Sequence, residues 1–127
     1  MIKLFEYLRA AEHTPFQWGR HDCCLFAADV VMVLTGNDPA HDLRGTYGNK
    51  DEADAVLAVH GGLAALCDAR FGPRVPVKLA QRGCIVLFDT PDGEALGVLD
   101  GPHIVGAGEL GTVRYRAARA QIAWRVA

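Results

Sequence analysis

The sequence predicts an α+β fold formed by a single domain over residues 1–127. Two observations support this fold class. Apolar residues recur with helical spacing up to about residue 70, and β-patterned runs separated by turn dipeptides follow from residue 83 onward. Half of the residues are apolar and 22% are charged, a globular mixture in a chain long enough to bury one core.

Residues 23–34 are predicted to form the central, buried helix. Asp29 is the only charged residue in this run, and a helix that is apolar nearly all round belongs in a core. Its length is too short to cross a bilayer. Asp22 is a suitable N-cap, which makes Cys23 the first helical residue, and Gly36 followed by Pro39 is a typical stop signal.

The other elements follow from local patterns. Residues 2–11 have helical spacing, residues 37–49 read as an irregular loop, and Asn49 is expected to cap a helix that starts at Lys50 and turns its apolar face, including Val59, inward. We further predict a short helix at 63–70, strands at 83–88, 95–99, 103–107, 112–115 and 122–126, and a helical turn within 116–121. The helices should pack on a C-terminal antiparallel meander.

Cys23 is the candidate nucleophile. A thiol at a helix N-terminus lies at the positive end of the helix dipole, which favours the thiolate and lowers its pKa. Thiol hydrolases place their nucleophile in this way. The competing interpretation is that Cys23 is a small, buried, apolar residue of the core, as free cysteines commonly are.

Composition narrows the partners and cofactors. The net charge of −2 gives no electrostatic reason to expect nucleic acid. Cys23, Cys24, Cys67 and Cys84 lack zinc-site spacing, so we expect free thiols, a reducing compartment, no metal and no cofactor. The N-terminus shows no secretory signal, so the protein should stay in a cytoplasm or leave it within an assembly.

Three segments together resemble the NlpC-type, papain-like cell-wall peptidases of bacteria and phages. Trp18-Gly19-x-x-Asp22-Cys23 is similar to the nucleophile segment of that family, the run 83–88 to its Gly-Asp-apolar strand with Cys84 in place of Asp, and the run 95–98 to its His-Val-Gly-Ile strand. The resemblance implies a papain-like fold, with a Cys-bearing helix packed on a sheet.

A closer resemblance is to a small uncharacterised family of phage and prophage proteins. The shared features are the Trp-Gly-x-His-Asp-Cys start, the Phe-Ala-Ala-Asp helix, the Ala-Leu-Gly-Val strand and the terminal Ala-Trp-Arg-Val at 123–126. This resemblance implies tail-tip proteins as partners, with peptidoglycan as a further possible one. It also implies assembly in the host cytoplasm followed by residence in the virion tail.

The chain departs from the peptidase pattern at the base. Ala95 stands where the peptidases have the activating histidine, and the third triad residue would fall near the apolar Val105. His103, on the neighbouring strand, and His21, beside the cap, are the remaining candidates for a base. Both are interpreted first as solvated or loop-holding residues. Strand alternation directs Glu94 to the face opposite Ala95.

Three functional hypotheses remain at this point. The favoured one is a phage-tail structural or assembly protein that keeps a peptidase fold without its chemistry. The second is an active thiol peptidase or amidase on peptidoglycan that uses Cys23 with a relocated base. The third, a thiol-dependent regulator or transferase, has no second motif in its support.

Overall fold

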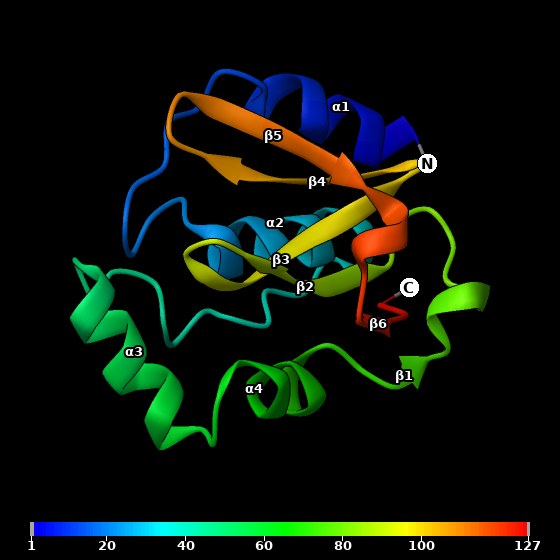
Figure 1. The fold of residues 1–127 in the computed structure, drawn as a ribbon. Helices are drawn as coiled ribbons and strands as arrows, with labels where there is room; N and C mark the ends of the chain where they lie inside the picture. Colours follow the sequence, from blue (N-terminus) through cyan, green and yellow to red (C-terminus); the bar gives the residue numbers. More distant parts are fainter. Residues whose placement is uncertain (1, 127) are drawn as a thin grey trace.

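Residues 2–126 are described by a computed structural model, shown in Figure 1. Four helices lie in the first part of this range: α1 (Ile2–Ala11), α2 (Cys23–Thr35), α3 (Lys50–Val59) and α4 (Leu63–Arg70). Six strands follow within the same range: β1 (Arg74–Val75), β2 (Ile85–Thr90), β3 (Gly93–Asp100), β4 (His103–Gly108), β5 (Gly111–Arg116) and β6 (Ile122–Trp124). Two short 3-10 turns, η1 (Val77–Leu79) and η2 (Ala117–Arg119), complete the chain. The predicted α+β class is confirmed.

All strand pairs are antiparallel, and the order across the sheet is β1-β6-β2-β3-β4-β5. The predicted meander holds for β2 to β5. The last strand differs from that plan, because β6 returns to lie between β1 and β2, where Trp124 faces Ile85 and Arg74. The two-residue strand β1 and the turn η1 were not predicted, since residues 74–79 carry neither clear period.

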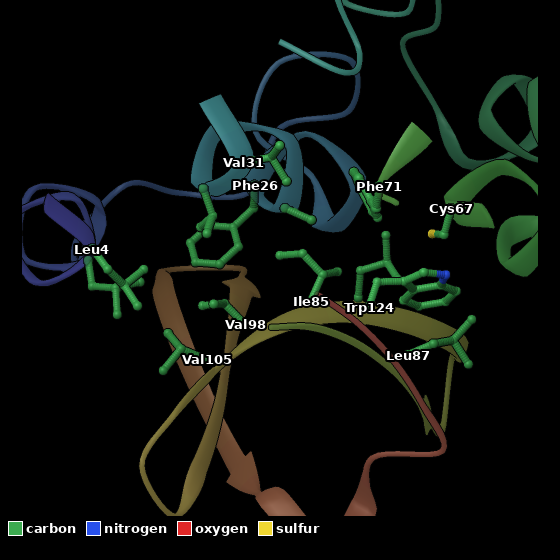
Figure 2. Close-up of a cluster of buried hydrophobic side chains, with 14 of the residues drawn as sticks. Leu4, Phe26, Val31, Cys67, Phe71, Ile85, Leu87, Val98, Val105 and Trp124 are labelled. Carbon is green, nitrogen blue, oxygen red and sulfur yellow. The ribbon is translucent and has the colours of Figure 1, made fainter. Parts of the chain in front are cut away.

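Helix α2 is the centre of the molecule. Five of its apolar residues are fully buried: Leu25, Phe26, Ala27, Ala28 and Val30. One side packs with α1 on the sheet, where the helices' side chains meet strand residues that include Val98, Val105 and Trp124 (Figure 2). The other side packs against the 36–49 loop, α3 and α4. Burial on both sides explains the apolar sequence of this helix.

The single charge within α2 is fully partnered. The Asp29 carboxylate accepts a hydrogen bond from the Tyr7 hydroxyl at 2.7 Å and forms an ion pair with Arg44 at 2.8 Å. Arg44 also binds Asp38 at 2.8 Å. Asp29 therefore connects α1, α2 and the following loop. A partly buried polar group is costly unless it has such hydrogen-bond and ion-pair partners.

The helix ends agree with the sequence. Asn49 accepts a hydrogen bond from the Glu52 N–H at 2.8 Å, and Gly36 adopts a left-handed conformation (φ 84°) after α2. The predicted inward face of α3 was wrong at Val59, which is 83% exposed. Ala53 is the buried residue of α3, and the half-buried Val56 and Leu57 pack beside it against the core.

Candidate functional site

A tight turn brings the chain to the head of α2. Gln17 and His21 exchange backbone hydrogen bonds at 2.8 and 3.0 Å, and Gly19 lies between them with φ 78°. A Cβ at Gly19 would collide with the carbonyl oxygen of Tyr47. Glycine is therefore required at this position for two reasons: the backbone is left-handed, and the 36–49 loop approaches too closely to leave room for a side chain.

Asp22 holds this turn and the helix together. Its buried carboxylate accepts hydrogen bonds from the Leu25 and Gly19 N–H groups, both at 2.9 Å, and from the Tyr47 hydroxyl at 2.6 Å. The predicted N-cap is thus confirmed, and two further donors join it. Asp22 is 1% exposed, so these three donors replace the water that its carboxylate oxygens would otherwise bind.

Cys23 is the first residue of α2, as predicted, and its side chain is half-buried. Its pKa is lowered, first by a hydrogen bond with the Cys24 side chain and then by one from the Leu96 backbone. Burial and the charge of Asp22 oppose this effect. The helix N-terminus acts in the same direction as the hydrogen bonds, because it stabilises negative charge at the sulfur.

The neighbouring thiols are held in the protonated form. The pKa of Cys24 is raised well above its ordinary value because its thiol hydrogen-bonds to Cys23 and is buried. Burial also raises the pKa of Cys67, which lies on α4 and packs in the core near Trp124 and Phe71 (Figure 2). Cys84 is buried on the other face of the sheet. All four cysteines are free, and Cys23 alone combines access with a lowered pKa.

Two cavities meet at Cys23. One, of about 430 Å³, lies between the turn before α2, α3, the start of α4 and the β2–β3 hairpin. The other, of about 580 Å³, extends over β3, β4 and β5. Five residues border both: Trp18, Cys23, Lys50, Asp92 and Glu94. We call the two cavities together the Cys23 groove. Each has the size of a small-ligand site.

The groove opens where β3 leaves β4. Their pairing ends at Val98–Val105, whereas β3 stays paired with β2 as far as Thr90–Gly93. Cys23, Leu96 and Ala107 border the second cavity at this separation. The second cavity of the groove thus lies beyond the last paired residues of β3 and β4.

Ala95 borders the same cavity as Cys23. It pairs with Phe88 and packs in the cluster on the sheet face away from α2, while Leu96 belongs to the α2-facing core. Glu94 therefore lies on the opposite side of β3 from Ala95, as alternation predicts. No histidine of residues 2–126 borders either cavity of the groove.

The structure does not bring the two candidate histidines to Cys23. His21 is buried next to the cap, with its ring edge-on to Phe26 at a centroid distance of 5.8 Å and its Nε2 without a hydrogen-bond partner. His103 is exposed at the far end of β4, paired with Asp100 and Arg116. It lies four positions before Ala107 at the groove, a distance of about 13 Å along a strand.

Two residues of the site were missed from the sequence. Trp18 is half-buried: it packs against the core cluster around α2 and α3, and it also lines the groove. Tyr47 was not predicted to belong to the site, because the local sequence of a loop tyrosine does not indicate a hydrogen bond to Asp22, 25 positions away. Trp124 is fully buried in the core. Across residues 2–126 no cluster of three or more His, Cys, Asp or Glu side chains is arranged to hold a metal ion.

The fold and this site define a class: a small α+β domain with a cysteine at the head of its central helix, in an open groove. The chain belongs to the family DUF6950, a domain of unknown function, whose model matches residues 2–126. A search of curated proteins found no match. None of the helices within residues 2–126 has both the length and the apolar character needed to span a membrane.

Proposed function

We propose that this protein is a structural or assembly component of a phage or prophage tail tip, built on an NlpC-type papain-like fold that has lost its peptidase chemistry. It would be made in the host cytoplasm and then reside in the virion tail. The tail assignment is supported by the sequence resemblance described above. The loss of chemistry is supported by the geometry around Cys23.

One observation carries the proposed loss of peptidase chemistry. Ala95, which the resemblance aligns with the activating histidine, borders the same cavity as Cys23, but it has only a methyl side chain and packs on the sheet face away from α2, so it offers the sulfur no proton acceptor. A thiol peptidase needs a base within hydrogen-bond reach to activate the sulfur and to protonate the leaving amine. Glu94 and Asp92 also border the cavity, but a carboxylate beside the sulfur disfavours the thiolate.

The test is turnover on purified peptidoglycan. Wild-type protein and the Cys23→Ala variant should release equal, background amounts of soluble muropeptides at every pH between about 5 and 9. Release by the wild type that disappears in Cys23→Ala would refute the proposal. The tail assignment is tested separately, by mass spectrometry of purified particles. The chain should be present in tails and absent from isolated capsids.

The alternative function is an active thiol peptidase or amidase on peptidoglycan. The observation that favours it is the lowered pKa of a half-buried Cys23 inside a groove. A purely structural cysteine has no need of a thiolate. This alternative requires a base that enters the groove from a partner or a substrate, since neither His21 nor His103 reaches it.

A further inference from the structure

The Cys23 groove carries more negative charge than the rest of the protein. Apart from the buried cap, its lining includes four carboxylates, Asp54, Asp92, Glu94 and Glu109, and one ammonium, Lys50. Lys50 is ion-paired with Asp54 at 2.9 Å. The other three carboxylates are exposed and form no ion pair with any residue in the range 2–126.

This charge is local rather than general. The whole chain has a net charge of −2, from 13 basic and 15 acidic residues. The lining of the groove has an excess of three negative charges, which is larger than the net charge of the whole chain. The arginines nearest in sequence to its β5 wall, Arg114, Arg116 and Arg119, do not border it. Clefts lined by one sign of charge attract ligands of the opposite sign.

The groove also offers apolar and aromatic surface. Phe16 and Trp18 stand edge to face at a centroid distance of 4.8 Å, and both line the second cavity together with Tyr115. Aromatic faces bind ammonium and guanidinium groups, and apolar walls pack against the aliphatic stems of lysine and arginine. Since the two cavities lie on either side of Cys23, an extended chain can occupy both at once.

We propose that the Cys23 groove binds an extended, basic polypeptide segment of a partner protein. The basic side chains of the segment face Asp92, Glu94 and Glu109, and its backbone crosses over Cys23. This inference rests on the proposed function, because it names the chemistry of the assembly partner. It uses Cys23 as the floor of a binding site and requires no covalent step.

The binding test uses a fluorescein-labelled peptide of alternating lysine and alanine, about ten residues long so that it can span both cavities when extended. The matched probe replaces every lysine with glutamate. Fluorescence anisotropy should show binding of the basic probe alone, and the affinity should fall as salt is raised. Equal binding of the two probes, or no binding of the basic one, would overturn the proposal.

Variants locate the binding. Asp92→Asn/Glu94→Gln should weaken the basic probe about tenfold, as expected for the loss of two charge pairs. Glu6→Gln/Glu12→Gln removes the same charge from exposed carboxylates outside the groove and should change affinity less than about twofold. Equal effects of the two double variants would mean that the probe binds the general negative field, which contradicts the proposal.

A second readout places the probe over the sulfur. Saturating basic peptide should slow the alkylation of Cys23 by iodoacetamide at least fivefold, while the acidic peptide leaves the rate unchanged. Lack of protection at saturation would exclude the groove as the site. Displacement of the basic probe by soluble muropeptides at lower concentration than by unlabelled basic peptide would favour a cell-wall ligand instead.

Failure here is separable from failure of the proposed function. If the protein neither releases muropeptides nor binds the basic peptide, the proposed loss of peptidase chemistry stands and the proposed binding of a basic segment is refuted. If the protein binds the basic probe and also releases muropeptides through Cys23, the proposed binding by the groove stands and the proposed function is refuted.

Discussion

The hydroxyl of Tyr47 donates a 2.6 Å hydrogen bond to the carboxylate of Asp22. The bond joins the 36–49 loop to the head of α2, across 25 positions of sequence. Both side chains are buried, with exposed fractions of 9% and 1%. The position of Cys23 thus depends on the Tyr47–Asp22 hydrogen bond, whose donor is far from Cys23 in the sequence.

The Asp22→Ala variant should be destabilised by about 3 kcal/mol, the sum of a lost helix cap and of buried donors on Gly19 and Tyr47 left unpaired. Asn49→Ala removes an equivalent cap from α3 at an exposed site and should cost about 1 kcal/mol. Urea unfolding of both variants and the wild type gives the comparison. Equal losses would show that Tyr47 and Gly19 contribute nothing through Asp22.

Alkaline pH should destabilise the protein through the titration of Tyr7 and Tyr47. Burial and a carboxylate partner raise the pKa of Tyr7 and Tyr47 above the ordinary value of 10.0. The unfolded chain therefore loses these protons at lower pH than the folded one. Their contribution is intact below pH 10 and declines above it, with a limiting slope of about 1.4 kcal/mol per pH unit for each group.

The variant Tyr7→Phe/Tyr47→Phe should be less stable than wild type at pH 7, because two hydrogen bonds to carboxylates are lost. Between about pH 10 and 11.5 the difference should narrow, since the wild type alone carries the two titrating groups. Denaturant midpoints measured across this range test the effect. Parallel stability curves for the two proteins would contradict it.

Iodoacetamide should label Cys23 before the other cysteines at pH 6–7. Its lowered pKa leaves more thiolate than Cys24 or Cys67 has, and its side chain borders the open groove. Peptide mapping after partial labelling should show at least a tenfold preference. The Cys23→Ser variant should lose the fast phase. Labelling of all four cysteines at a common rate would indicate that unfolding, and not a local thiolate, controls access.

The substitution Glu94→His should increase the reactivity of Cys23, because Glu94 lies on the α2-facing side of β3 and borders both cavities of the groove together with Cys23. An imidazolium near a thiol lowers the thiol pKa by roughly 1–3 units, so alkylation at pH 6 should become about tenfold faster. Ala118→His, on the exposed turn η2, is the control and should have no effect. An unchanged rate in Glu94→His would mean that this position does not face the sulfur.

Gly97 is required by packing within the sheet. A Cβ there would come 2.5 Å from the Ile104 side chain and 2.8 Å from the Val105 carbonyl oxygen, so Gly97→Ala should cost about 2–3 kcal/mol. Gly106→Ala, whose Cβ would lie 3.4 Å from the Leu96 oxygen, should cost less than about 1 kcal/mol. Thermal unfolding distinguishes the two. The reverse order would show that β3 shifts readily away from β4.

The helices were predicted nearly to the residue because their signals are local. Asp22 and Asn49 bond to N–H groups three positions ahead, and Gly36 is adjacent to the helix it ends. Val59 was misplaced because helical spacing identifies an apolar face but not whether another element covers it. The position of β6 was missed because strand order depends on contacts between residues far apart in the chain.

The amino-acid sequence alone determined that a thiol stands at the head of a buried helix, since capping, periodicity and the glycine turn act over a few residues. The tertiary structure decided the surroundings of that thiol. The Tyr47 bond, the separation of β3 from β4, the cavity shared by Cys23 and Ala95 and the distance of His103 all arise from long-range packing. Such packing depends on the shape of the whole chain, and a short motif does not encode it.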